Sequence, residues 1–203
     1  MIVESAGGRP VLHSSATVSA TAVISGDVYI GAGSVVLAAA VITSQGAPVR
    51  IGESCVVMEH AVIRGAGVHA CTLGDHVLVG PHSHVSGATV EPDCFLATGC
   101  AVFNGAVLGR GTTVAVHGIV HVGCRCPPET FVPIGYAALG DPARLYGPHE
   151  MAEARDALFE QGFTRSVFGF DSAEMSNAEA TRELCERYAR ALARHGEERI
   201  LTD

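Results

Sequence analysis

The sequence predicts a mainly β fold, a left-handed parallel β-helix of hexapeptide repeats with C-terminal α-helices, and three observations support it. An aliphatic residue recurs nearly every six positions, and a small residue follows most of these four positions later. Glycine and β-branched residues are too frequent for a helix, and strands alone would alternate every two residues. The aliphatic positions are Leu12, Val18, Ile24, Ile30, Val36, Ile42, Ile51, Val57, Ile63, Leu73, Val79, Val85, Val90, Leu96, Val102, Leu108, Val114 and Val120.

These positions define a triangular coil with three short strands per turn. The aliphatic residue fills the interior, and the small residue packs where the chain bends toward the axis. The eighteen aliphatic positions make about six coils, stacked roughly 4.8 Å apart as neighbouring strands are. Two interruptions, Ser44 to Val49 and Gly65 to Thr72, are expected to be loops at corners. The pattern ends near Cys126-Pro127-Pro128, so we assign residues 1–135 to the β-helix.

Residues 136–203 are predicted to form an exit segment and C-terminal helices. A first helix is expected from Pro148 to Gln161, with Met151, Ala154 and Leu158 on one face. A second helix is expected to begin near Ser176, which has capping-box spacing to Glu179. Its apolar stripe, Leu184, Tyr188 and Leu192, should pack on the β-helix or on a neighbouring subunit.

Composition excludes several classes of function. The net charge is −8 and no basic cluster appears, which argues against nucleic acid as a partner. No apolar run is long enough for a membrane span, and the N-terminus lacks a signal pattern, so a cytoplasmic protein is expected. All 13 basic residues are arginine, which excludes Schiff-base chemistry. The odd cysteine count indicates free thiols; Cys55, Cys94 and Cys100 occupy small inward positions and should be inert.

Several motifs give the chain a resemblance to the γ-class carbonic anhydrases within the hexapeptide-repeat superfamily. They are Gly26-Asp27-Val28-Tyr29-Ile30-Gly31, Ile51-Gly52-Glu53, Leu73-Gly74-Asp75-His76-Val77-Leu78-Val79-Gly80, Asn104-Gly105-Ala106-Val107-Leu108-Gly109 and the exit segment Gly140-Asp141-Pro142-Ala143-Arg144. The resemblance covers roughly residues 10 to 150. It implies a homotrimer in which three histidines from two neighbouring chains hold zinc at each interface.

The zinc positions of that family are substituted in this chain. Carried over by motif, they fall on Arg64, Pro81 and Ser86, none of which is an ordinary zinc ligand. The family's Gln-Asp pair falls on Met58-Glu59, where only the acid survives. Its Arg-Gly-Asp stretch falls near Thr43-Ser44-Gln45. Standard hydration of CO₂ is therefore not expected.

The repeat register indicates where the histidines point. His60, His82 and His117 each lie three residues beyond an interior residue of one strand column, so His60 and His82 should lie one coil apart on one outward line. In the next column, a second outward line is expected one residue after each interior position. Its members are Arg64, Ser86, Phe103 and His121.

These lines lead us to expect a displaced site at the trimer interface. A metal, Zn²⁺ or Fe²⁺, would be held by His60, His82 and His84, with an open position for substrate. Without a metal, the same groups would serve as acid, base and anion clamp. The proposed catalytic residues are Glu59, Arg64 and His82. The proposed substrate-binding residues are Ser86, Phe103, Asn104 and His121.

Three functions remain open from the sequence. The first is a lyase or hydratase acting on a small carboxylate or carbonyl substrate. The second is a non-catalytic trimeric scaffold or ligand-binding module. The third is an acyltransferase, because the repeats are shared with that class of enzyme. Interface histidines without a ligand could also serve structure alone, by capping corners or bonding across a subunit contact.

Overall fold

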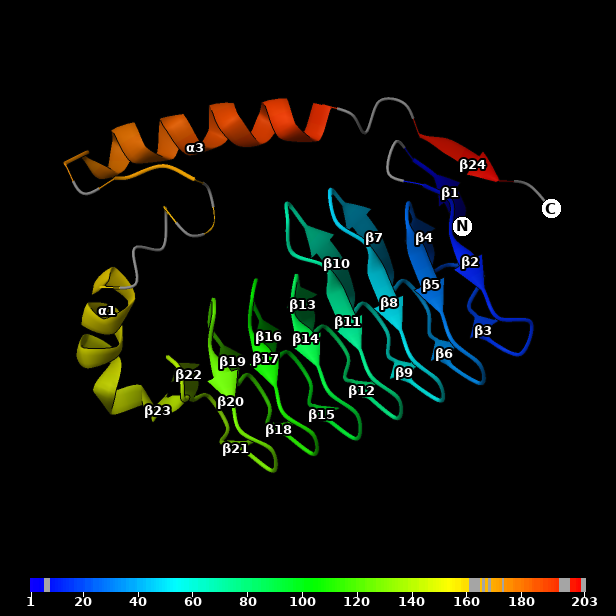
Figure 1. Ribbon diagram of the computed structural model, residues 1–203, viewed down its shortest axis with the longest axis horizontal. Coiled ribbons are helices and arrows are strands. Elements are labelled where there is room, and N and C mark those ends of the chain that lie inside the picture. Colours follow the sequence, from blue (N-terminus) through cyan, green and yellow to red (C-terminus); the bar gives the residue numbers. More distant parts are fainter. Residues whose placement is uncertain are drawn as a thin grey trace.

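The computed structural model describes residues 1–5, 8–160, 165, 167, 169–172, 174–193 and 198–201. The chain winds into the predicted left-handed parallel β-helix, whose strands line up in three sheets along its length (Figure 1). We name these sheets face I, face II and face III in the order in which the first full coil, β2 to β4, visits them.

The strands of each face stack in chain order. Most of them are two or three residues long. Face I contains β2 (Val11–Leu12), β5 (Val28–Ile30), β8 (Val49–Ile51), β11 (Cys71–Leu73), β14 (Thr89–Val90), β17 (Val107–Leu108) and β20 (Arg125–Cys126). Face II contains β3 (Thr17–Val18), β6 (Val35–Val36), β9 (Val56–Val57), β12 (Leu78–Val79), β15 (Phe95–Leu96), β18 (Thr113–Val114) and β21 (Phe131–Val132). Face III contains β1 (Ile2–Glu4), β4 (Val23–Ser25), β7 (Val41–Gln45), β10 (Val62–Ala66), β13 (His84–Ser86), β16 (Ala101–Val102), β19 (Ile119–Val120) and β22 (Ala137–Leu139).

The predicted interior positions form the core. From the second coil onward they are almost completely buried, and each lies in register with its counterparts in the coils above and below, as Ile30 does with Ile51. The small inward residues also tie coils together. The Ser34 hydroxyl donates to the Gly52 carbonyl at 2.8 Å, and the Cys55 thiol donates to the Gly74 carbonyl at 3.0 Å. Cys55, Cys94 and Cys100 are buried free thiols, as predicted.

The prediction of six coils that end near Cys126 was wrong, because a seventh coil follows. In β20 to β22, Cys126 pairs with Leu108, Val132 with Val114, and Ala138 with Val120. All three side chains on the new coil are buried. The six-residue period therefore continues past Val120, but cysteine and alanine take two of the interior places that larger aliphatic residues fill elsewhere. With β1, face III has eight parallel strands.

The two predicted corner loops begin as strand. β7 and β10 each run for five residues, and their ends pair Ser44 with Gly65 and Gln45 with Ala66. Both interruptions occur at the corner between face III and face I, in successive coils. Because they lie above one another, their backbones can continue the ladder before the chain turns.

The three histidines of the outward line occupy tight turns at the corner between face II and face III, which we call the II–III corner. His60, His82 and His117 have φ values of 58°, 56° and 56°, the left-handed region. Histidine tolerates this region better than β-branched residues do. The same conformation at the same step of successive coils makes the histidine Cα–Cβ bonds parallel.

Antiparallel strands and helices complete the chain. β23 (Arg144–Tyr146) pairs with β22, and β24 (Arg199–Leu201) pairs with β1. A 3₁₀ turn, η1 (Pro148–Glu150), leads into α1 (Met151–Glu160), where Ala154 is buried against Leu139 and Tyr146. Leu158 packs against the same cluster, whereas Met151, at the start of the helix, is 43% exposed. The predicted last residue, Gln161, lies outside the described residues.

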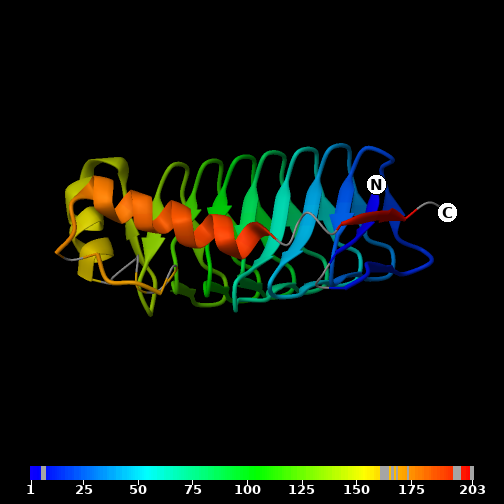
Figure 2. The same ribbon diagram turned by 90° about the horizontal axis from the view of Figure 1, so that it is seen from above.

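The second helix is α3 (Asn177–Leu192), and Ser176 caps it as predicted. The Glu179 amide donates to the Ser176 hydroxyl, and the Ser176 amide donates to the Glu179 carboxylate at 2.9 Å. α3 runs along the length of the coil, and its Leu184, Tyr188 and Leu192 are half-buried (Figures 1 and 2). None of the described helices is long and apolar enough to cross a membrane.

Candidate functional site

The corner histidines form a stacked pair. The imidazole rings of His60 and His82 are parallel within 3°, with centroids 5.0 Å apart, and both residues are exposed. This separation is the spacing of adjacent coils, so the prediction of one outward line was correct. His117 lies two coils beyond His82, and its ring covers Gly99, where a Cβ would come within 2.6 Å of it. Glu59 is half-buried beside this line, and its carbonyl accepts the His82 amide at 3.1 Å.

A row of hydrogen bonds connects three neighbouring coils on face III. Arg64 and Ser86 are register partners in β10 and β13. The Arg64 Nε donates to the Ser86 hydroxyl at 3.1 Å, and this hydroxyl donates to Asn104 Oδ1 at 2.7 Å. Ser86 is 1% exposed, so its single proton and its acceptor site are both used inside the protein. Arg64 and Ser86, two of the positions that the resemblance assigns to zinc ligands, therefore do lie together.

Arg64 is a half-buried cation that lacks an acidic partner. One of its terminal nitrogens donates to Gln45 Oε1 at 3.4 Å, and no carboxylate of the described residues lies within ion-pair distance. By contrast, Arg50 and Arg110 form ion pairs with Asp27 and Asp93. A guanidinium has five N–H donors, so Arg64 keeps donors available for an external anion.

An aromatic cluster borders this row. The ring of Phe103 lies 6.1 Å from that of His84 and 5.9 Å from that of His121, tilted by 43° and 47° respectively. All three side chains are half-buried on the outer side of face III. His84 and Ser86 lie two residues apart on the same side of β13, so the aromatic cluster and the hydrogen-bonded row adjoin.

Two of the imidazoles are biased toward the neutral form. Burial lowers the pKa of His84, and the nearby Arg64 guanidinium lowers it further. Burial alone lowers the pKa of His121. A neutral imidazole at this position is able to accept a proton from a substrate or from water.

The predicted site residues thus fall into two groups within one chain. Glu59, His60 and His82 lie at the II–III corner; the others lie on face III or, for Asn104, in the turn that leaves it toward face I. The side chains of His60 and His82 make a ring contact with each other and none with Arg64 or His84. Among the described residues no group of three or more histidine, cysteine or acidic side chains is close enough to hold a metal. Because the two stacked rings are parallel, their nitrogen lone pairs do not converge on one point.

Sequence reasoning missed two neighbours of the Arg64 row. Gln45 contacts the Arg64 guanidinium because the extended β7 pairs with β10. His69 packs over Gly87, where a Cβ would lie 2.6 Å from the His69 Cβ and 3.2 Å from Asn104 Oδ1. The sequence held one indication that these residues lie near Arg64: both interruptions of the repeat fall at the same corner in successive coils.

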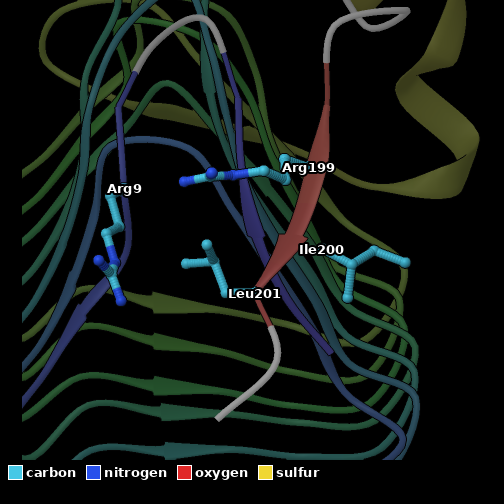
Figure 3. Close-up of a pocket in the computed structure, with 4 residues that line it drawn as sticks. All are labelled: Arg9, Arg199, Ile200 and Leu201. Carbon is cyan, nitrogen blue, oxygen red and sulfur yellow. The ribbon is translucent and has the colours of Figure 1, made fainter.

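A separate hollow lies at the N-terminal end of the coil, where β24 joins β1 (Figure 3). Arg9, Arg199, Ile200 and Leu201 line it, and Arg199 donates to the Glu4 carboxylate at 2.6 Å. Leu201 points toward Arg9 and Ile200 points to the opposite side of β24. This hollow shares no residue with the predicted site.

Comparison with known sequences supports the resemblance. No family model matches the chain. It is 28% identical over 142 residues to γ carbonic anhydrase 1, mitochondrial, of Arabidopsis thaliana, a match that covers 67% of this chain and 50% of the relative. It is 32% identical over 139 residues to the carboxysome assembly protein CcmM of Synechococcus elongatus, which covers 63% of this chain and 25% of that protein. The chain thus spans half or less of the length of these relatives.

Solved structures share the fold. LpxA of Bacteroides fragilis, a UDP-N-acetylglucosamine acyltransferase, has a TM-score of 0.57 at 15% identity, with 84% of this chain and 77% of that chain covered. A hexapeptide transferase family protein of Anaplasma phagocytophilum has a TM-score of 0.51 at 18% identity, with 96% of each chain covered. The chain thus has the hexapeptide-repeat β-helix fold of these structures, and its sequence is similar to those of γ carbonic anhydrases.

The lowered pKa values predict acid sensitivity. An imidazole with a lower pKa in the folded chain binds its proton more readily in the unfolded chain, so stability falls as the pH drops below about 6.5. We expect the urea midpoint to decrease between pH 7 and pH 5. A double variant, His84→Gln with His121→Gln, should show a shallower decrease. An equally steep decrease in the variant would show that other groups cause the acid sensitivity.

Proposed function

We propose that the chain forms a homotrimer that binds a small carboxylate- or carbonyl-bearing substrate at each subunit interface and catalyses a lyase or hydratase reaction. The observation that carries this proposal is Arg64, a half-buried guanidinium fixed by Ser86 and Gln45 and left without a carboxylate among the described residues. Such a group is suited to bidentate binding of a carboxylate.

The remaining residues take roles around this clamp. Ser86 fixes the guanidinium, while Phe103, Asn104 and His121 line the substrate on the same face. A hydratase must take a proton from water and return one to the substrate. In our proposal His82, with Glu59 beside it, performs proton transfer from the II–III corner of a neighbouring chain. This arrangement would join the two groups of residues that one chain keeps apart.

The surface of face II supports the trimer. Fourteen outward positions follow its seven strands, and none of them carries a charge. They are Thr17, Val35, Val56, Leu78, Phe95, Thr113 and Phe131, followed by Ser19, Leu37, Met58, Gly80, Ala97, Ala115 and Pro133. In a closed three-fold assembly one patch meets a different patch of the next chain. In our proposal, face II and the II–III corner of one chain meet face III of the next chain.

The substrate clamp is tested with small carboxylates. We expect acetate and pyruvate to bind the wild-type protein in titration calorimetry, and Arg64→Gln to weaken binding by about 10- to 100-fold, the usual loss for a hydrogen bond to a charged group. Arg110→Gln is the matched control, because Arg110 is already paired with Asp93 on another corner and should leave binding unchanged. Equal binding by wild type and Arg64→Gln would contradict the clamp.

The interface is tested by placing a charge on face II. Met58 is half-buried beside the II–III corner, and Met58→Glu should convert the trimer to monomers that keep the circular dichroism of the β-helix. Val11→Glu is the control, since Val11 is 58% exposed on face I and should not affect assembly. Light scattering measures both masses. A Met58→Glu protein that remains trimeric would place the interface elsewhere.

A metal-dependent form of the proposal adds Zn²⁺ or Fe²⁺ at the corner pair. One chain supplies His60 and His82, whose parallel rings would have to rotate to face one ion, and His84 or another donor would have to come from a neighbouring chain. Elemental analysis of protein produced with added zinc and iron should then find about one metal per subunit. His60→Ala with His82→Ala should lose it, and His117→Ala should keep it. Absence of metal from the wild type would end this form of the proposal.

Two other functions have an observation in their favour. The sequence similarity to the carboxysome assembly protein CcmM favours a non-catalytic scaffold. This function would be preferred if no small carboxylate binds. The fold shared with LpxA favours an acyltransferase, which would instead show binding of coenzyme A. We rank both below the lyase or hydratase, because the observation that carries our proposal is Arg64, which has no carboxylate partner among the described residues.

A further inference from the structure

Asn104 provides a second donor beside the Arg64 clamp. The Ser86 hydroxyl accepts from Arg64 Nε, so its proton is directed to Asn104 Oδ1. With its oxygen engaged, the Asn104 amide presents its two N–H groups. Arg64 and Asn104 thus present donors on either side of Ser86, and a carboxylate has two oxygens to receive them.

The surface next to these donors is aromatic. Phe103 immediately precedes Asn104, and its ring lies between the imidazoles of His84 and His121. Phe103 lies one coil beyond Ser86 and two coils beyond Arg64 along the same outward line, a distance of roughly 9.6 Å at about 4.8 Å per coil. That distance accommodates a carboxylate joined to one six-membered ring.

We propose that the preferred ligand of this site is an aromatic carboxylate, with its carboxylate between Arg64 and Asn104 and its ring against Phe103. This inference rests on the proposed carboxylate site and narrows its substrate class. An aromatic ring would gain an edge-to-face or offset contact with Phe103 that a saturated ring cannot make. The tilted imidazoles on either side would limit the ligand to one flat ring.

The test compares ligands of the same charge and similar size. We expect benzoate to bind about three- to tenfold more tightly than cyclohexanecarboxylate, the range that aromatic contacts contribute, and acetate to bind more weakly than either. Phe103→Leu should abolish the preference for benzoate while acetate binding remains. Tyr29→Leu is the matched control, because Tyr29 is an exposed aromatic residue on face I, away from the proposed interface. Unchanged thermal unfolding establishes that each variant is folded.

A second test requires no substitution. Nuclear Overhauser effects should be observed between the ring protons of benzoate and those of Phe103. If acetate binds through Arg64 but benzoate has no advantage over cyclohexanecarboxylate, the aromatic preference is wrong and the carboxylate site stands. If benzoate is preferred equally by Phe103→Leu, the ring lies elsewhere and the inference is also wrong. If no carboxylate binds, both the site and the preference are overturned.

Discussion

The constraint on which this structure depends is the stacking of equivalent residues in successive coils. Each interior position lies directly on its counterpart, and backbone hydrogen bonds fix that register along all three faces. Outward side chains are then also arranged in columns, and neighbouring members of one column lie about 4.8 Å apart. Polar and aromatic side chains on such a surface therefore lie in rows, as the stacked rings of His60 and His82 do.

The Arg64 row is a consequence of that register. Arg64 and Ser86 are distant in sequence, yet pairing of β10 with β13 brings them into hydrogen-bond contact. The bond fixes the orientation of the guanidinium without neutralising its charge. A carboxylate partner would have done both. The pair therefore leaves a positive charge on face III, a feature suited to an anion.

Much of the fold followed from the sequence, because its repeat period directly reports which residues face inward. The period located the core and the histidine line at the II–III corner. It did not reveal the seventh coil, since Cys126 and Ala138 fill interior places without being large aliphatic residues. The contact between Gln45 and Arg64 was also missed, because it depends on strand pairing between two interruptions that looked like loops. Which groups meet across subunits depends on a second chain, and no repeat period of one chain encodes that.

The ends of face III have a further consequence. A β-helix that ended on a parallel strand would present an open ladder onto which another copy could stack in the same direction, and repeated stacking would yield a fibre. Here β24 covers β1 and β23 covers β22, and both run antiparallel to the strand they cover. A second copy stacked on either end of this face would therefore meet an antiparallel strand rather than a parallel one. The parallel ladder of face III is thus interrupted at each end by a short segment of this chain.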